Sequence, residues 1–154
     1  MNITIFGCGF VGGTVANFLE EKYAGERYNI VKVDPLHYPD VDPQQAAMEA
    51  DSVIICVPTP SEYFGECDDS IVRSVLELCD ERVPILLKSS VTPDLIEKYS
   101  ANVIYNPEFL REAHAENDFK NQHTFVLGHH KNNKEQAKHW ADLFCIPEWN
   151  VVYT

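Results

Sequence analysis

The chain has 154 residues, 45% of them hydrophobic and 11% aromatic, which suits one domain with a sizeable core and excludes a disordered chain. Its formal net charge of -12, from 12 basic and 24 acidic side chains, argues against nucleic acid or an anionic membrane as a partner. No apolar run approaches the roughly 20 residues of a membrane helix, and no signal peptide is visible. Together with an odd number of cysteines without CxxC spacing, this predicts a cytoplasmic protein of one domain, residues 1–154.

Strand-like and helix-like segments alternate along the chain. A strand over residues 3–6 precedes a helix over residues 10–24, and a second strand ends at Asp34. After a proline-rich link, Asp42-Pro43 starts another helix. Further strands are expected at 52–57, 85–87, 103–105, 124–127 and 151–153, and further helices at 69–78, from 92 onward, at 108–116 and at 134–144. This alternation predicts a Rossmann-type α/β fold, a doubly wound and mostly parallel sheet with helices on both faces.

A glycine-rich turn joins the first strand to the first helix. Residues 7–12, Gly-Cys-Gly-Phe-Val-Gly, form a G-x-G-x-x-G sequence. Gly7 allows the tight turn, Gly9 lets a pyrophosphate approach the backbone, and Gly12 lets helix and strand pack closely. Asp34 stands about 20 residues further on, where a carboxylate accepts hydrogen bonds from the adenosine ribose and repels a 2′-phosphate. We therefore predict a site that prefers NAD over NADP, the alternative being a glycine turn in a non-binding α/β protein.

Three more loops follow predicted strands, at the edge where ligands bind in such sheets. They are residues 57–60 (Val-Pro-Thr-Pro), 88–91 (Lys-Ser-Ser-Val) and 106–108 (Asn-Pro-Glu). Glu108 and Glu112 would share one helix face, where two carboxylates can do acid–base work. The alternative is helix-end chemistry, with Ser90 and Thr92 as caps and the two glutamates as favourable charges in a first turn. The pattern alone leaves both interpretations open.

Taken together, these motifs resemble the UDP-glucose/GDP-mannose dehydrogenase family. The most specific is residues 106–112, Asn-Pro-Glu-Phe-Leu-Arg-Glu, and residues 115–119 and 124–128 continue the resemblance. It covers nearly the whole chain and keeps the family's order of motifs. Such enzymes oxidise the C6 alcohol of a nucleotide sugar, for example UDP-glucose, to a carboxylate with two NAD in succession.

The resemblance also implies roles for individual residues. Ser90 would hold an active-site water or the substrate oxygen, and Glu108 would transfer protons during thioester hydrolysis. Glu112 would lie between cofactor and substrate, as a third catalytic candidate. The expected NAD contacts are Gly7, Gly9, Phe10, Val11, Gly12, Asp34, Val57, Pro58, Thr59, Pro60, Ser89, Ser90, Val91 and Glu112.

The chain departs from the family in several places. The family's nucleophilic cysteine lies in a Gly-Gly-x-Cys-x-Pro-Lys-Asp run that these residues do not contain, and no cysteine here replaces it. Residues 35–51 stand where the family has a longer segment, so we expect a fold trimmed by about one strand-helix unit. Pro35-Leu36-His37 replaces the usual basic residue after the ribose acid, and Ser90 replaces a threonine. His129-His130 lacks a third ligand at suitable spacing, so no metal is expected.

Two hypotheses follow from these departures. In the first, the chain is the NAD-binding domain of a nucleotide-sugar dehydrogenase, incomplete for catalysis alone and working with a separate chain that carries the cysteine domain. In the second, it is a non-catalytic NAD-binding module or an interaction protein derived from that family.

Overall fold

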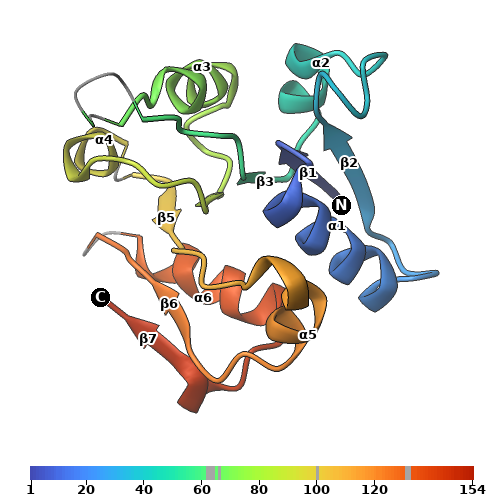
Figure 1. The fold of residues 1–154 in the computed structure, drawn as a ribbon, viewed down its shortest axis with the longest axis vertical. Coiled ribbons are helices and arrows are strands. Elements are labelled where there is room, and N and C mark those ends of the chain that lie inside the picture. The colour runs from blue at the N-terminus through green and yellow to red at the C-terminus, as the bar shows by residue number, and fades with distance from the viewer. Residues whose placement is uncertain (62–64, 66, 100, 131–132) are drawn as a thin grey trace.

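A five-stranded parallel sheet organises the chain (Figure 1). The computed structural model describes residues 1–61, 65, 67–99, 101–130 and 133–154, with the side chains of Glu112 and Trp149 left out. The strands are β1 (Asn2–Phe6), β2 (Asn29–Val33), β3 (Ser52–Ile55), β4 (Ile85–Leu87) and β5 (Val103–Tyr105). Their order, β2-β1-β3-β4-β5, is that of a doubly wound sheet without its outermost strand. The predicted fold class, trimmed at this edge, is confirmed.

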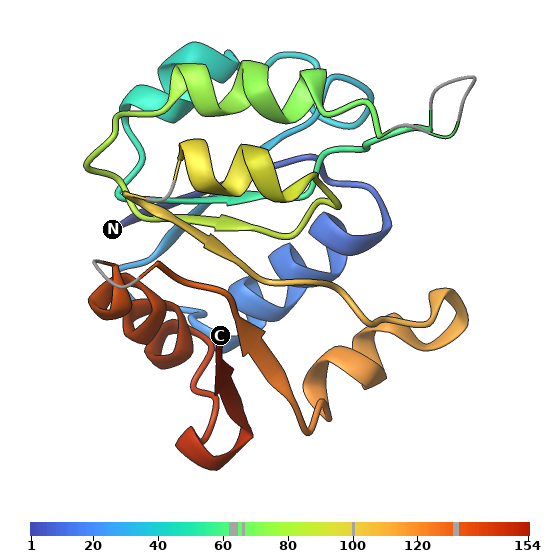
Figure 2. The ribbon, with the colours of Figure 1, turned by 90° about the vertical axis from the view of Figure 1, so that its left-hand side faces the viewer.

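Helices cover both faces of the sheet (Figure 2). One face carries α1 (Phe10–Lys22), α5 (Ala115–Lys120) and α6 (Lys134–Leu143), and the other carries α2 (Pro43–Met48), α3 (Ser70–Leu78) and α4 (Pro93–Lys98). Successive strand side chains point to opposite faces, so Ile54 packs into the first core while Val53 and Ile55 pack into the second. Both faces of the sheet are therefore buried, which explains the nearly continuous apolar run of β3.

A second, two-stranded sheet extends the first. In it, β6 (Phe125–Leu127) pairs in parallel with β7 (Val151–Tyr153), which follows a 3-10 turn, η2 (Glu148–Asn150). Gly128 joins this sheet to β5 because its N–H and carbonyl both bond Tyr105, at 2.7 and 2.9 Å. The bridge is antiparallel, so the whole sheet is mostly rather than wholly parallel.

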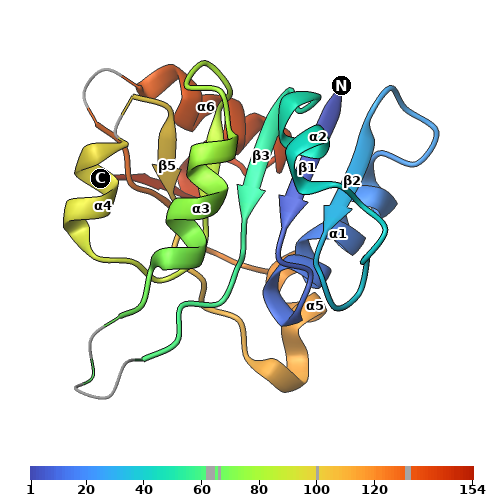
Figure 3. The same cartoon turned by 90° about the horizontal axis from the view of Figure 1, so that it is seen from above.

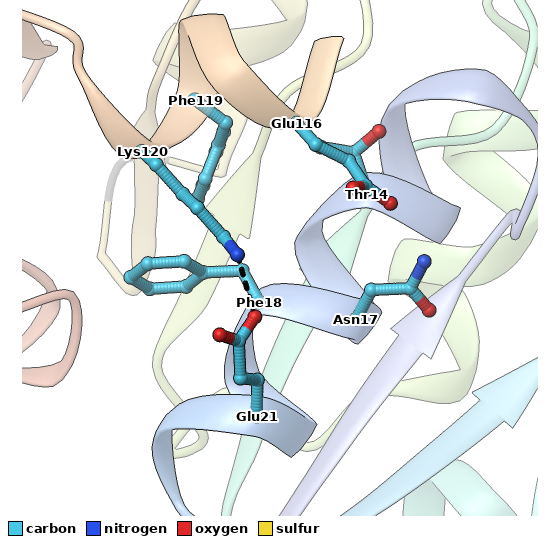
Figure 4. Close-up of a pocket in the computed structure, with 7 residues that line it drawn as sticks. All are labelled: Thr14, Asn17, Phe18, Glu21, Glu116, Phe119 and Lys120. Atoms are coloured by element: carbon cyan, nitrogen blue, oxygen red, sulfur yellow. Dashed lines mark hydrogen bonds and ion pairs between the residues drawn. The ribbon is translucent and has the colours of Figure 1, made fainter.

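Helix α5 is fixed against α1 (Figure 4). Lys120 Nζ lies 2.6 Å from Glu21 Oε2, and the rings of Phe18 and Phe119 meet edge to face at 5.1 Å. The hollow between these side chains measures about 30 Å³, room for a water or two and not for a cofactor. Across the described part of the chain, no helix has the length and apolar character to cross a membrane.

Candidate dinucleotide site

The predicted loops leave the sheet at one edge. Strands β1 to β5 are all parallel, so their carboxyl ends face the same side, and the segments that follow β1, β3 and β5 emerge there together (Figure 3). The helix α1 begins at the same edge, directly after the glycine turn. The fold therefore brings the glycine turn, Asp34 and the three loops to one place, as the sequence predicted.

Each of the three glycines in the glycine turn has a different structural role. Gly7 has φ +82°, and a Cβ there would lie 2.7 Å from the carbonyl oxygen of Cys56. At Gly12 a Cβ would lie 1.8 Å from the carbonyl oxygen of Gly7. At Gly9, by contrast, no atom of the described residues lies within 4 Å of a Cβ position. Two glycines are thus required by the fold, while Gly9 keeps open the space before the helix N-terminus.

That space suits a pyrophosphate. Gly9 is the N-cap of α1 and provides no side-chain cap, and the first N–H groups of a helix have no partner within the helix. Phe10 and Val11 occupy the first turn, with Phe10 exposed and Val11 half-buried. Backbone donors and the positive end of the helix dipole bind anions without any basic side chain, which matters in so acidic a chain.

Asp34 is tied to both the glycine turn and its own loop. Its Oδ2 accepts from the N–H of Cys8 at 2.7 Å, and its Oδ1 accepts from the N–H groups of Leu36 and His37 at 2.9 and 3.1 Å. The ring Nδ1 of His37 lies 3.0 Å from the same Oδ1. Burial alone would raise the pKa of Asp34, but these bonds outweigh it and hold that pKa below its usual range. The residue is therefore a carboxylate near neutral pH.

An apolar cavity of about 450 Å³ opens beside Asp34. Four of the predicted cofactor residues line it: Gly7, Asp34, Val57 and Pro58. The rest of its wall comes from β1, β2, the link after β2, α2 and α3, through Phe6, Val33, Pro35, Leu36, Tyr38, Pro39, Val41, Pro43, Ile71, Ser74, Val75 and Leu78. A largely apolar cavity with one carboxylate at its rim has the chemistry that an adenosine needs.

The loop after β3 is held by the loop after β4. Ser89 is buried, and its hydroxyl donates to the carbonyl oxygen of Val57 at 2.7 Å. Thr59 is half-buried, whereas Pro58 and Pro60 are exposed. Ser89 therefore positions the loop through its hydroxyl, while the neighbouring Ser90 has an exposed side chain and Val91 a half-buried one.

A buried lysine joins the ends of β4 and β5. Lys88 Nζ donates to Asn106 Oδ1 at 2.7 Å and lies 2.8 Å from Glu108 Oε2, with only 2% of its side chain exposed. Asn106 in turn donates to the carbonyl oxygen of Val126 at 2.7 Å. The sequence prediction named Lys88 only as part of a loop. A lysine that directly continues three buried strand residues was the signal for a paired, internal cation.

The predicted helix over residues 108–116 begins too early and ends too soon. Residues 106–111 have no regular secondary structure, a 3-10 turn, η1, covers Glu112–His114, and α5 runs from Ala115 to Lys120. The Glu108 side chain pairs with Lys88, and the N–H of Phe109 donates to Glu108 Oε1 at 2.8 Å, contacts that accompany the non-helical path. Glu108 and Glu112 therefore do not share a helix face, and the side chain of Glu112 lies outside the described structure.

The alternative interpretation, in which the Thr92 side chain caps a helix, gains little support from the structure. This residue occupies the N-cap position of α4, but its hydroxyl makes no cap hydrogen bond within the described residues. Pro93 at the first helical position, with its preset φ, and Asp94 in the first turn favour the start of the helix instead.

Three of the five cysteines have thiols whose pKa is raised by burial. Burial raises the pKa of Cys8 to about 11, that of Cys56 to about 12 and that of Cys79 to about 11. Since the thiolate is the reactive form, these three side chains are poor nucleophiles at neutral pH. Cys67 and Cys145 are free thiols as well.

The fold and the groups at its carboxyl edge define a dinucleotide-binding domain of the Rossmann type. A family model described as the NAD-binding domain of the UDP-glucose/GDP-mannose dehydrogenase family matches residues 38–144. The chain belongs to this family, and its cofactor is NAD.

Relatives and solved structures agree with this assignment. UDP-glucose 6-dehydrogenase of Rickettsia felis is 29% identical over 178 aligned positions, which cover 90% of this chain and 39% of the relative. GDP-mannose 6-dehydrogenase of Pseudomonas aeruginosa is 27% identical, over 83% of this chain and 41% of the relative. The crystal structure of a GDP-mannose dehydrogenase ternary complex from Pseudomonas aeruginosa superposes with a TM-score of 0.80 at 22% identity, over 100% of this chain and 46% of that one. The chain therefore spans less than half the length of these relatives.

Proposed function

We propose that this chain is the cofactor-binding part of a nucleotide-sugar 6-dehydrogenase, with NAD held between the glycine turn and Asp34. The observation that carries the proposal is the Cys8 N–H bond to Asp34, which fixes the ribose acid to the phosphate-binding turn beside an apolar cavity. The same charge on Asp34 would repel a 2′-phosphate, so NAD is bound in preference to NADP.

The residues at the glycine turn each have a defined task in this proposal. The space at Gly9 admits the pyrophosphate, and the first N–H groups of α1 donate to it. Asp34 accepts hydrogen bonds from the ribose, and the cavity lined by Val57 and Pro58 takes the adenine. NAD, once bound, supplies the hydride acceptor for oxidation of the alcohol.

Glu108 and Ser90 are the groups that we propose for the chemistry. Conversion of an alcohol to a carboxylate needs two hydride acceptors and one water, and it releases protons that a nearby carboxylate can take. Glu108 Oε2 is held by Lys88, and the residue borders a surface hollow of about 400 Å³ together with Phe109 and Arg111. Ser90, exposed at the end of the neighbouring β4, offers a hydroxyl for the substrate oxygen or the water.

The proposal assigns the nucleophile to a cysteine outside these 154 residues. None of the five cysteines here lies in the family's glycine-rich setting, and burial keeps three of them protonated. We propose that a separate chain carries this cysteine and the site for a sugar such as UDP-glucose. We also propose a reducing, cytoplasmic setting, because the cysteines are all free, and a single domain over residues 1–154.

The NAD site is tested with two glycine variants. Titration calorimetry should show tighter binding of NAD than of NADP to the wild-type chain. Gly9→Ala should weaken the binding of NAD at least tenfold without unfolding the chain, because the alanine Cβ enters the open space proposed for the phosphates. Gly13→Ala is the matched control, since its Cβ makes only an ordinary contact with the carbonyl of Cys8, at 3.4 Å. Equal affinity for NAD and NADP would refute the role of Asp34.

Activity separates the proposed enzyme part from a non-catalytic module. The chain alone should not form NADH from UDP-glucose, and addition of a chain with the missing cysteine domain should start the reaction. Glu108→Gln should then lower the rate at least a hundredfold, the usual weight of a proton-transfer group. Full activity of Glu108→Gln would contradict its role, and NAD binding without activity under any pairing would favour the non-catalytic module.

A further inference from the structure

The acceptor sites of Asp34 are almost all occupied within the chain itself. A carboxylate has about four lone-pair sites for hydrogen bonds. Oδ1 receives the N–H groups of Leu36 and His37 and the His37 ring, and Oδ2 receives the N–H of Cys8. Oδ2 thus keeps a place for one hydroxyl, whereas a ribose presents two. The second hydroxyl needs Oδ1, where three donors already meet.

Only one of these donors can leave at low cost. The N–H of Cys8 belongs to the glycine turn, and those of Leu36 and His37 belong to a tight turn that the Tyr38 N–H closes onto the Asp34 carbonyl at 2.8 Å. The His37 ring is different, because 55% of its side chain is exposed and rotation about its own bonds moves it into solvent. The imidazole is therefore the group that a second ribose hydroxyl would displace.

We propose that the His37 imidazole and the adenosine ribose compete for Asp34 Oδ1, so that His37 sets the affinity of this domain for its cofactor. The inference rests on the proposed role of Asp34 as the ribose acceptor. His37 changes the affinity for the cofactor through its contact with Asp34, and it does not need to touch the cofactor. Its ring turns back onto the acid, with Nδ1 3.0 Å from Asp34 Oδ1.

The test measures the NAD affinity of the full chain by calorimetry. His37→Ala should bind NAD about fivefold more tightly than wild type, the equivalent of one ordinary hydrogen bond. His130→Ala is the control, because this exposed histidine follows the Gly128 bridge to β5, at the other end of the sheet from β2. It should match wild type.

A background variant shows whether His37 acts through Asp34. In Asp34→Ala both acceptor oxygens are gone, so a further His37→Ala should leave the affinity unchanged. Weaker NAD binding by His37→Ala in the wild-type background, or an unchanged affinity there, overturns the inference and leaves the proposed NAD site intact. Failure of every folded variant and of wild type to bind NAD overturns the proposed function and the inference together.

Discussion

The two ends of the carboxyl edge of the sheet differ in the kind of groups that line them. The adenosine end is the apolar cavity beside Gly7 and Asp34, where the polar contacts are mainly backbone N–H groups. The Glu108 end is the cluster of Lys88, Asn106 and Glu108, where a buried lysine donates to an amide oxygen and forms an ion pair with a partly buried carboxylate. Under the proposed function, the first end would bind its ligand by shape and backbone groups, whereas the second keeps the Lys88 ammonium away from water.

The difference shows where each end is vulnerable. A buried ion pair contributes little net stability when intact, but loss of one partner leaves an uncompensated charge. A backbone turn carries no such charge. It is destabilised when an added atom clashes at a place where two segments are in contact. Substitutions at the adenosine end should therefore destabilise the fold by steric conflict, and substitutions at the Glu108 end should destabilise it by leaving a charge unpaired.

The largest expected effect is at the Glu108 end. Lys88→Met should lower the free energy of unfolding by about 3–5 kcal/mol, because the Glu108 carboxylate stays behind without its cation. Lys120→Met, which breaks the exposed pair with Glu21, should cost at most about 1 kcal/mol. Urea denaturation followed by circular dichroism measures both.

A second variant separates charge from packing. Adding Glu108→Gln to Lys88→Met removes the unpaired charge, so the double variant should recover part of the loss. If Lys88→Met and Lys120→Met cost the same, the buried pair is no different from a surface pair, and the contrast between the two ends fails.

The next effect is steric and lies at the adenosine end. Gly12→Ala should lower the free energy of unfolding by about 3 kcal/mol, since its Cβ would sit 1.8 Å from the Gly7 carbonyl oxygen and the backbone must move. Gly13→Ala, one residue along the same helix, should be neutral or stabilising because alanine favours helix. Thermal unfolding distinguishes them, and equal stability of the two variants would contradict the close contact.

The smallest effect lies away from both ends, on α6. His139 Nε2 is 3.1 Å from Ser52 Oγ, and burial lowers the pKa of His139, partly opposed by Asp142. As the pH falls below about 6.5 the unfolded chain takes up this proton first, so stability should fall, by no more than about 1.4 kcal/mol per pH unit.

The His139 contribution is found by comparing two histidine variants. His139→Gln should flatten the decline in stability below neutral pH, whereas His37→Ala, at the exposed edge of the adenosine end, should leave most of it. A decline that persists unchanged in His139→Gln would assign it to other groups.

The sequence predicted the local fold of the adenosine end well because the residues that form it are close together in the chain. Gly7, Gly12 and Asp34 belong to one strand-turn-helix-strand unit, and the turn chemistry of each glycine follows from its neighbours along the chain. The alternation of apolar runs likewise determined the sheet, both helical layers and nearly every element. Even here the His37 contact with Asp34 was not predicted, since an exposed side chain has several rotamers that sequence does not rank.

The Glu108 end was decided by tertiary structure alone. Lys88 and Glu108 lie in loops that follow different strands, and the parallel alignment of β4 with β5 brings their charges within 2.8 Å. The local helical pattern does not predict that ion pair. Residues 106–111 form no regular secondary structure beside it, a 3-10 turn begins at Glu112, and α5 begins at Ala115. Local propensity differs by a few tenths of a kcal/mol per residue, whereas an unpaired buried charge costs several, so the long-range contact prevails.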